Sequence, residues 1–580
     1  MEFKELVFYL AQLEATASRN KITEILAALF KKTSEKEIDK ICYLCLGELA
    51  PAYAGLDFNF AEKLMIRVVA RATNLSETVI RKEYKRIGDL GEVAQKLKTE
   101  NLRLAIEEKK SLSVDDVYER LLQMAKESGG GSVERKINVM IRLLDDLDGS
   151  AGKYIVRIPL GKLRLGFSEL TIFDALSWMI GGDKTNRQII EEAYNVRADV
   201  GQIAKIIKKE GLVGLKKIKI DLGVPIVSAL CQRLDNPEEM IKKMGKVAVE
   251  PKYDGTRLQV HWQHSGDFKV RAFTRNLENV TAMFPDITQA LDKEVKAKNV
   301  IFDGEAIGYD PKTNKFLPFQ ETIKRKRKYL IGDTAKEIPL KYFVFDILYK
   351  DGQDLLTLPL NERRQILEKV LLPQAERIKL SPQIVTEKAE EIRSFHHQQI
   401  KKGLEGAVVK KWTAGYDPGR RGFTWVKFKQ EKGKKGGGLT DTLDCVVMGY
   451  FKGKGKRTDF GSGAFLVGVR ESINSDKILT ISKIGTGLTD EQWREITKRG
   501  QKVVSKQKPD VYSVPKNLTP DVWCQPKIVV EIEADNITKS PLHTAQYALR
   551  FPRLVRFRDD KSVDQSTTLK EAKKIYQLQG

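Results

Sequence analysis

The chain has 580 residues, of which 41% are hydrophobic and 19 are proline. This length is far above one ordinary domain, so two to four domains are expected, and the composition excludes disordered and fibrous proteins. Lys and Arg number 101 against 78 Asp and Glu, which gives a formal charge of +23. That excess favours a polyanionic partner, with nucleic acid as the first candidate, although a basic solvated surface gives the same composition.

Three features bear on the compartment. The N-terminal stretch MEFKELVFYLAQLEATA is expected to be a helix rather than a signal peptide, because Gln12 and Glu14 interrupt its apolar run. No run of about eighteen apolar residues occurs, so we expect no membrane span. Five cysteines in so long a chain indicate a reducing compartment. We therefore expect an intracellular protein, in the cytoplasm or nucleoid, or in the nucleus if the organism is eukaryotic.

Cys42 and Cys45 form a CxxC pair inside the apolar helical stretch ICYLCLGEL. A zinc site of the ribbon type needs a second pair, and none follows at the required spacing. The five histidines, among them His261 and His264, form no ligand cluster with the cysteines. We therefore expect two buried cysteines on a helix face and no metal chemistry through His or Cys.

Hydrophobic periodicity divides the chain into three parts. Residues 1–225 carry apolar positions three and four apart, which predicts an all-α domain. Residues 226–432 carry short β-rich runs separated by DG and GD turns, which predicts a mixed α+β domain. A glycine-rich, charged stretch at 432–438 lies near the next boundary. Residues 433–580 carry five β-rich runs and one helical run, which fits a small barrel of the oligonucleotide-binding (OB) type.

The stretch EPKYDGTR at 250–257 places Lys252 in a turn after a predicted strand. A lysine attacks as the free amine, and its ordinary pKa near 10.4 keeps it protonated at neutral pH. Nearby cations disfavour the ammonium form, and Arg257, Lys427 and Lys429 are candidates for that task. The alternative is an ordinary DG turn with Lys252 as a solvated surface residue.

KYDGTR is the first of seven blocks whose order carries a resemblance. The chain resembles ATP-dependent DNA ligases of the archaeal and eukaryotic type, within the nucleotidyltransferase superfamily. The seven blocks are KYDGTR (252–257), FTRNLENVT (273–281), FDGEAIGYD (302–310), YFVFDILYKDG (342–352), EGAVVK (405–410), WVKFK (425–429) and RFPRLVRFRDDK (550–561). The resemblance implies an N-terminal DNA-binding domain, an adenylation domain and a C-terminal OB-fold barrel.

The resemblance also implies a reaction and its cofactors. Lys252 would attack the α-phosphate of ATP, with Mg²⁺ present, and form a covalent lysyl-AMP while pyrophosphate leaves. AMP would then pass to the 5′-phosphate at a nick in double-stranded DNA, and the 3′-hydroxyl would displace it. Each step moves negative charge around phosphorus, which calls for fixed cations. The expected setting is DNA replication, recombination and repair.

Two residues resemble the adenine contacts of the family. Glu250 would accept a hydrogen bond from the exocyclic amine, and the ring of Phe345 would stack on the purine. Phe343 alternates to the same strand face, so the choice between the two rings stays open. A strand aromatic in the core is the alternative for Phe345.

Four further residues match family positions for the sugar, the phosphates and the metal. Arg257 and Arg275 would hold ribose and phosphate oxygens, since the guanidinium fork makes two bonds to one anion. Glu305 and Glu405 match carboxylates that bind Mg²⁺ or the ribose. Either glutamate paired with a surface cation is the alternative. Asn276 departs from the family pattern, in which a second basic residue often stands, and this leaves auxiliary phosphate contacts open.

Arg421 and Lys427 match the cations that grip the α-phosphate, with Lys410 and Lys429 as weaker candidates. The terminal block would orient the leaving pyrophosphate through Arg556, Arg558 and Lys561. Its distance in sequence implies that the barrel swings onto the site for the first step and away afterwards, with the stretch near 432 as the hinge.

Other segments are candidates for contacts to the DNA backbone. Glycine-bearing turns at 128–137 and 161–172 each lead into a predicted helix, whose N-terminus offers N–H groups to phosphates. Ordinary capping by Ser132 and Ser168 explains the same residues. The runs KRKRK (324–328) and KGKGKR (452–457) are backbone contacts, solvated charge runs or nuclear signals. We expect a monomer that encircles nicked DNA, with recruitment by a sliding clamp left open.

Two other functions compete with nick sealing. An RNA ligase or a capping-type nucleotidyltransferase would share the KxDG lysine and the barrel, but the helical domain ahead of Lys252 argues against both. A non-catalytic, basic DNA-binding protein would have the same charge. The retention of Lys252, Glu305, Glu405 and Lys427 argues against a site that has lost its reaction. No GxxxxGK[ST] motif occurs, which excludes a simple P-loop ATPase.

Overall fold

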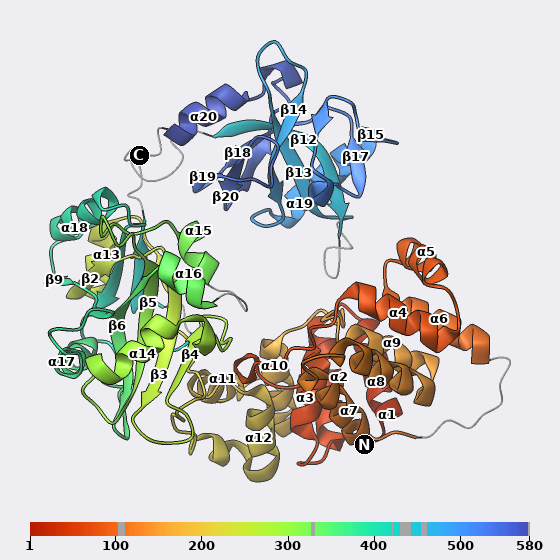
Figure 1. The fold of residues 1–580 in the computed structure, drawn as a ribbon, viewed down its shortest axis with the longest axis horizontal. Helices are drawn as coiled ribbons and strands as arrows, with labels where there is room; N and C mark the ends of the chain where they lie inside the picture. The colour runs from red at the N-terminus through yellow and green to blue at the C-terminus, as the bar shows by residue number, and fades with distance from the viewer. Residues whose placement is uncertain (103–110, 326–330, 420–421, 430–441, 454–460, 578–580) are drawn as a thin grey trace. The chain divides into compact units, whose positions relative to one another are not determined.

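The computed structural model describes residues 1–102, 111–325, 331–419, 422–429, 442–453 and 461–577. The chain forms two compact units, residues 1–428 and 429–580 (Figure 1). The first unit contains the helices that precede residue 216 and the two sheets that follow them, and the second unit is rich in β-structure. Within the described residues, no helix is both long and apolar enough to cross a membrane.

The N-terminal part of the first unit is helical, as predicted. Its α-helices are α1 (Phe3–Glu14), α2 (Arg19–Lys32), α3 (Ile38–Leu46), α4 (Glu62–Thr73), α5 (Glu77–Ile87), α6 (Leu90–Leu102), α7 (Val114–Lys126), α8 (Ser132–Asp146), α9 (Gly149–Arg157), α10 (Glu169–Gly181), α11 (Arg187–Val196) and α12 (Val200–Leu215).

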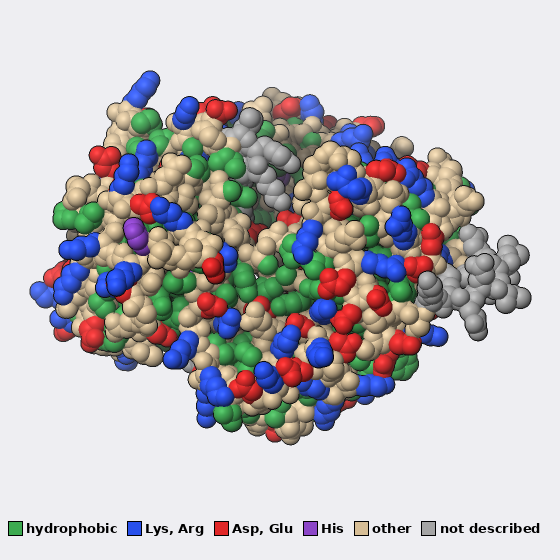
Figure 2. Space-filling model, turned by 60° about the horizontal axis from the view of Figure 1, so that its bottom comes forward, with side chains coloured by type: hydrophobic (Ala, Val, Ile, Leu, Met, Phe, Trp, Pro, Cys, Tyr) green, Lys and Arg blue, Asp and Glu red, His purple; other side chains and the backbone are tan. Residues whose placement is uncertain are grey.

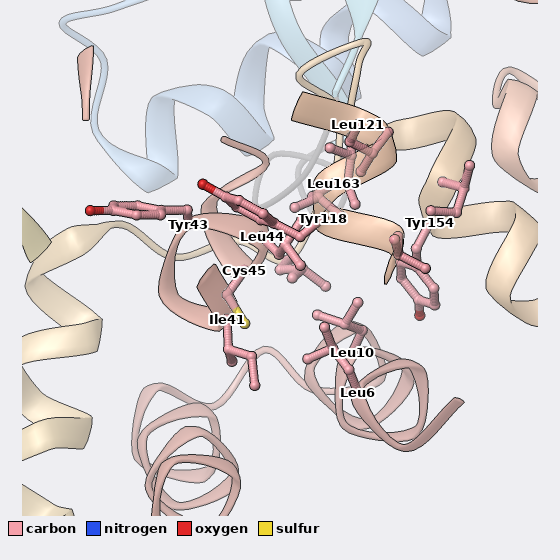
Figure 3. Close-up of a cluster of buried hydrophobic side chains, with 14 of the residues drawn as sticks. Leu6, Leu10, Ile41, Tyr43, Leu44, Cys45, Tyr118, Leu121, Tyr154 and Leu163 are labelled. Atoms are coloured by element: carbon pink, nitrogen blue, oxygen red, sulfur yellow. The ribbon is translucent and has the colours of Figure 1, made fainter. Parts of the chain in front are cut away.

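The helical core forms because apolar side chains recur on one face of each helix. Figure 3 shows Leu6 and Leu10 of α1 near Ile41 and Cys45 of α3, with side chains from α7 and α9 in the same cluster. Burial of each such leucine contributes about 1.5–3 kcal/mol. Cys42 and Cys45 are both buried in α3, which confirms the prediction of core cysteines on a helix.

The two glycine-bearing turns lead into helices as expected, but serine capping does not explain them. Gly131, with φ of 73°, occupies the N-cap of α8, and Ser132 is already the first helical residue. Ser168 occupies the N-cap of α10, yet its side chain makes no capping hydrogen bond. The prediction that Ser132 and Ser168 cap these two helices with their side chains is therefore wrong.

The rest of the first unit is built on two sheets. The first sheet runs in the order β1 (Gln232–Arg233), β11 (Trp425–Phe428), β10 (Ala407–Lys411), β2 (Val247–Pro251) and β9 (Ile384–Thr386). The second runs in the order β4 (Val270–Thr274), β3 (Thr256–Gln263), β5 (Asn299–Gly308), β6 (Leu340–Lys350) and β7 (Gln353–Asp354), with β8 (Ile378–Leu380) parallel to β6. The predicted strands near residues 250, 260, 303 and 345 are confirmed as β2, β3, β5 and β6.

Helices cover one apolar face of each sheet. Helices α13 (Pro237–Met244) and α18 (Ala389–Lys401) pack on Val247 and Val249 of the first sheet. Helices α14 (Pro285–Glu294) and α17 (Leu360–Val370) pack on the second sheet. Two short helices, α15 (Phe319–Thr322) and α16 (Ile331–Glu337), follow β5. Because side chains alternate along a strand, the opposite sheet faces carry the polar residues of β2, β3, β5 and β10.

The second unit has the predicted strand and helix order. Strands β12 (Leu443–Lys452), β13 (Ser462–Arg470) and β14 (Ile478–Ile484) form an antiparallel meander, followed by α19 (Asp490–Lys502) and later by β18 (Val529–Glu533) and β21 (Arg553–Phe557). Strand β12 also pairs with β18, and β18 pairs with β21. The elements missed by the sequence analysis are short, namely β15 (Val504–Ser505), β16 (Tyr512–Ser513), β17 (Val522–Cys524), β19 (Asn536–Lys539), β20 (Tyr547–Arg550) and α20 (Leu569–Gln577).

Buried His261 and its neighbour Gln259 on β3 form hydrogen bonds with the segment that links the helices to the sheets, at Gly223 and Ile226. The Nδ1 atom of His261 accepts from Gly223 N at 3.1 Å, and its Nε2 lies 2.9 Å from Gln259 Oε1. The side chain of Gln259 also bonds both the N and the O of Ile226. Because Nδ1 accepts, His261 is the neutral Nε2–H tautomer.

We predict that His261 makes the fold sensitive to acid. Burial, with a smaller effect of the Arg271 charge, lowers the pKa of His261 to about 3. In the unfolded chain the pKa is near 6.5, so between these values the unfolded state binds the extra proton and stability falls as the pH decreases. Between pH 7 and pH 4 the wild type should lose roughly 2–4 kcal/mol more than His261→Asn. Chemical denaturation across this range measures the difference, with exposed His264→Asn as the control. Parallel curves for the wild type and His261→Asn would contradict the prediction.

Candidate active site

Lys252 lies directly after β2, where the backbone continues the ladder between β2 and β10. Its N–H donates to Gly406 O at 2.9 Å, and Glu405 N donates to Lys252 O at 3.1 Å. Gly406 has φ of 129°, and a Cβ there would overlap the Phe428 carbonyl oxygen. This close approach brings residues 252 and 405 together although 153 positions separate them in sequence.

The Nζ atom of Lys252 forms an ion pair with the carboxylate of Glu405. The side chains of Lys252 and Glu405 are 22% and 16% exposed, so the pair is reachable from solvent. The sequence analysis expected cations beside Lys252, but the charged group in contact with it is a carboxylate. This contact arises because the ladder places β2 and β10 side by side, and the role of nearby cations stays a prediction.

Lys410 and Glu250 form a buried ion pair on the polar face of the first sheet. Lys410 Nζ lies 3.0 Å from both carboxylate oxygens of Glu250 and donates to Phe345 O at 3.0 Å. An ammonium has three N–H donors, and all three are used. While these contacts hold, Lys410 has no donor for an anion, and its role as a weaker phosphate contact stays a prediction.

Arg257 of β3 forms an ion pair with Asp303 of the neighbouring strand β5. Its Nε and Nη2 donate to the two Asp303 oxygens at 3.0 and 2.6 Å, Nη1 donates to Ala229 O at 2.8 Å, and Nη2 lies 3.4 Å from Tyr416 Oη. A guanidinium has five N–H donors, so one remains for an outside group. Sequence analysis expected the fork of Arg257 to hold phosphate or ribose, but Asp303 occupies the fork.

The two candidate rings of β6 have different surroundings. Phe343 stacks on Tyr253 with centroids 4.6 Å apart and an interplanar angle of 20°. Phe345 lies edge-on to Trp425 at 5.8 Å and 4.5 Å from Lys410 Nζ. The register of β5 and β6 shifts next to this position, between Asp303 and Gly304, and such irregularities re-aim side chains. Phe345 is thus the ring beside the Glu250 pair, while Phe343 packs against Tyr253.

Glu305 lies on β5, opposite Arg257 of β3. Burial raises the pKa of Glu305 to about 7, and the charges of Lys252 and Arg257 oppose that rise. The backbone between them is tight, since a Cβ at Gly255 would overlap the Ala306 carbonyl oxygen. Glu405 contacts Lys252, and Glu305 lies within electrostatic range of it, so the site holds two carboxylates near the lysine. Mg²⁺ takes one or two protein carboxylates together with phosphate oxygens, and this donor set fits it.

The remaining predicted cations are placed differently. Lys427 of β11 lies opposite Val408 of β10, and Val408 lies opposite Glu250 of β2. Lys427 and Glu250 therefore share the polar face of the first sheet. Arg275 is exposed in the turn after β4, and no hydrogen bond or ion pair joins it to another described residue. Arg421 lies outside the described residues. Lys429 belongs to the second unit, where it lies 3.8 Å from Asp535.

The terminal block lies in the second unit, with its cations paired to carboxylates. Arg556 Nε donates to Glu531 at 2.7 Å. Arg558 and Lys561 both bond Asp444, at 2.8 and 2.6 Å. Within this unit, the block is held by the acidic residues of β12 and β18.

Sequence reasoning missed three residues of the first unit. Asp303 lay within the FDGE block but was assigned no role, although a carboxylate inside a β-rich run is a signal of a buried pair. Trp425 began the WVKFK block and gave no sign that its indole lies 4.3 Å from Lys410 Nζ. Tyr416, whose hydroxyl donates to Asp303 at 2.7 Å, lies in no block, and nothing in the sequence singles it out.

The charge excess forms no single patch on the face of the molecule drawn in Figure 2. On the face drawn in Figure 2, Lys and Arg side chains are interspersed with Asp and Glu rather than gathered in one patch. The basic run at 324–328 is described only at residues 324 and 325, where Lys324 pairs with Glu321 and Arg325 is buried against Asp286. The run at 452–457 is described only at residues 452 and 453.

We predict that the hydroxyl of Tyr416 stabilises this site. It donates to Asp303 and accepts from Ala229 N at 2.9 Å, so Tyr416→Phe leaves two buried groups short of a partner. The free energy of unfolding should fall by about 1–3 kcal/mol. Tyr349→Phe is the matched control, because Tyr349 packs in the same cluster and its hydroxyl bonds no described residue. Denaturant titration of both variants measures the difference, and equal losses would refute the assignment.

Comparisons with known proteins agree along the whole chain. Three family models match, described as "DNA ligase N terminus" (residues 2–177), "ATP dependent DNA ligase domain" (228–429) and "ATP dependent DNA ligase C terminal region" (458–561). A "Probable DNA ligase" of Dictyoglomus turgidum is 43% identical over 587 residues, covering 100% of this chain and 98% of that protein. A "DNA ligase" of Saccharolobus solfataricus is 38% identical over 599 residues, with the same coverage.

A solved structure titled "Pmar-Lig_PreS3" has the same fold, with a TM-score of 0.55 and 18% identity. It covers 95% of this chain and 99% of its own, and at this identity it shows the fold alone. The order of a helical region, a central sheet region and a β-rich C-terminal unit thus agrees with a known architecture. Since full-length relatives at 38–43% identity and three successive family models agree, the chain belongs to the ATP-dependent DNA ligases, which join DNA strands at nicks.

Proposed function

We propose that this chain seals nicks in double-stranded DNA during replication, recombination and repair, with Lys252 as the residue that carries AMP. The observation that supports the proposal best is the contact of Lys252 Nζ with Glu405, at a point also reached by the charge of Glu305. A nucleophilic lysine flanked by two carboxylates suits transfer of a nucleotide that arrives with a divalent cation.

The proposed first step uses groups of this chain in defined roles. Lys252 must lose a proton before it attacks, and the Glu405 carboxylate in contact with Nζ is placed to accept it. The Nζ–phosphorus bond then forms at the α-phosphate of ATP, the bond to the bridging oxygen breaks, and pyrophosphate leaves. Lys427, and Arg421 beyond the described residues, would stabilise the charge on the α-phosphate. Mg²⁺ held by Glu305 and Glu405 would neutralise phosphate charge.

The proposed nucleotide pocket follows from the polar faces of the two sheets. Glu250 would accept from the adenine amine and Phe345 would stack on the base. Arg257 would contact the sugar with its one remaining donor, and exposed Arg275 would reach the phosphates. The boundaries 1–225, 226–432 and 433–580 are proposed as DNA-binding, adenylation and OB-fold domains. The central family model, residues 228–429, supports the bounds of the adenylation domain, while the other two models, residues 2–177 and 458–561, lie inside the proposed flanking domains.

The proposal extends to the partners and the compartment. The N-termini of α8 and α10 are candidates for contacts to DNA phosphates, since serine capping does not account for their sequences. We propose a monomer that encircles nicked DNA inside the cell, at the nucleoid or in the nucleus. Recruitment by a sliding clamp remains a further proposal. The cations of the terminal block, Arg556, Arg558 and Lys561, would exchange their carboxylate partners for pyrophosphate when the barrel closes.

The deciding experiment follows the AMP group. The protein is incubated with Mg²⁺ and ATP labelled at the α-phosphate, run on a denaturing gel, and then chased with nicked duplex DNA. We expect label on the protein that disappears as a sealed strand forms. Label that stays on the protein would mean an acceptor other than nicked DNA. No label would favour the non-catalytic binding protein.

We predict that Lys252→Ala abolishes the labelled adduct, because the variant lacks the Nζ atom that would form the bond to AMP. Lys252→Arg should abolish it as well, since a guanidinium keeps a cation beside Glu405 but stays protonated. Both variants should unfold at denaturant concentrations close to that of the wild type. An adduct on either variant would rule out Lys252 as the AMP carrier.

We predict that binding to nicked DNA weakens steeply with salt. Cations that contact phosphates release counterions, so the logarithm of the binding constant should fall linearly with the logarithm of salt concentration, by about 0.9 per phosphate contact. Fluorescence anisotropy with a nicked duplex at several salt concentrations gives the slope. A slope near zero would argue that the basic residues do not grip the DNA backbone.

A further inference from the structure

Lys410 is the most deeply buried cation of the nucleotide pocket, and the reaction steps give it no role. Its side chain is 1% exposed, and Glu250 beside it is 3% exposed. The register places Lys410 of β10 opposite Ala248 and Val408 opposite Glu250, so Lys410 and Glu250 are diagonal neighbours on one sheet face. A buried ion pair is costly to desolvate, which calls for a reason beyond stability.

The contacts of Lys410 join the two sides of the pocket. Its Nζ bonds both oxygens of Glu250 on the first sheet and the carbonyl of Phe345 on the second, each at 3.0 Å. It lies 4.5 Å from the ring centroid of Phe345 and 4.3 Å from that of Trp425. An ionised carboxylate has about four acceptor positions, so two remain on Glu250 for another donor.

Several charged groups surround Glu250, and Lys410 is the one in direct contact. Burial raises the pKa of Glu250, and Lys410 opposes that rise more than Arg364 of α17 does. Asp346 of β6 adds to the rise. The hydroxyl of Tyr253 also lies within electrostatic range. Without the ammonium, burial would favour the protonated carboxyl.

We propose that Lys410 sets the purine specificity of the pocket by holding Glu250 as an acceptor-only carboxylate, so that a base with an amino group at position 6 is preferred over one with a carbonyl. Lys410 is thus a positioning residue that acts on the base through Glu250. The inference rests on the proposed function, in which Glu250 accepts from adenine. It adds the residue that makes Glu250 an acceptor.

The chemistry of a carboxyl group gives this arrangement its selectivity. An ionised carboxylate can only accept, so it pairs with the adenine amine and meets the carbonyl oxygen of hypoxanthine or guanine with two acceptors face to face. A protonated carboxyl also donates, and it can bond that carbonyl oxygen. Loss of Lys410 should therefore relax the choice of base at neutral pH, and a higher pH should restore it.

The test compares ATP with ITP, whose base carries a carbonyl where adenine carries the amine. Initial rates of protein labelling are measured with each nucleotide, labelled at the α-phosphate, between pH 6.5 and pH 9. In Lys410→Met the ATP/ITP rate ratio should fall by about tenfold or more near pH 7 and recover toward pH 9. The wild-type ratio should stay nearly constant over this range. Lys410→Arg, which keeps a cation, should stay close to the wild type.

Two more variants complete the design. Lys411→Met removes the next lysine of β10, which lies on the other strand face, and should keep the wild-type ratio. Glu250→Gln carries both a donor and an acceptor at every pH, so its ratio should be low and independent of pH. If Lys410→Met does not fold, as judged by circular dichroism, the Glu250→Gln ratio decides.

The outcomes separate this inference from the proposed function. A wild-type ATP/ITP ratio in Lys410→Met across the pH range, or in Glu250→Gln, would overturn the inference while leaving the ligase function intact. A merely structural role of Lys410 would lower both rates together and leave their ratio unchanged, which would also overturn it. A wild type labelled by neither nucleotide would overturn both proposals.

Discussion

Two cations, buried Lys410 and partly exposed Arg257, connect the second sheet of the first unit to the first sheet and to the segment ahead of it. Lys410 belongs to the first sheet and bonds the Phe345 carbonyl of the second. Arg257 belongs to the second sheet and bonds the carbonyl of Ala229, just ahead of the first. Removing one partner of such a pair leaves an uncompensated buried charge, at a cost of about 3–5 kcal/mol. The relative position of the catalytic groups depends on these two bridges.

Each cation at the centre of the site already has a carboxylate partner. Lys252 pairs with Glu405, Lys410 with Glu250, and Arg257 with Asp303. In the first pair both side chains are partly exposed, at 22% and 16%, whereas the carboxylates of the other two pairs are 3% and 0% exposed. The buried pairs therefore shape the pocket, while the solvent-accessible pair is free to exchange its proton or its partner. This division separates the groups that position the nucleotide from the group that reacts with it.

Local patterns were enough to predict the longest strands, such as β3, β5, β6, β12 and β13, and the helical character of the N-terminal part. Strand β3 alternates Leu258, Val260 and Trp262 toward the core with polar residues between them, and this period of two is visible in the sequence. The elements that escaped prediction are short strands such as β15 and β16, which pair over two residues only. Their conformation depends on a neighbouring strand rather than on their own residues.

Residue types and their order along the chain were sufficient to indicate the family, the reactive lysine and the carboxylates around it, because the chemistry of nucleotide transfer restricts which side chains can serve. The sequence did not show which of these side chains contact one another. That Glu405 contacts Lys252, that Lys410 has no donor left for a phosphate, and that Tyr416 completes the Arg257 network follow from strand register and from the approach of two sheets. Such contacts join residues at least 65 positions apart, and only tertiary packing brings them within hydrogen-bonding distance.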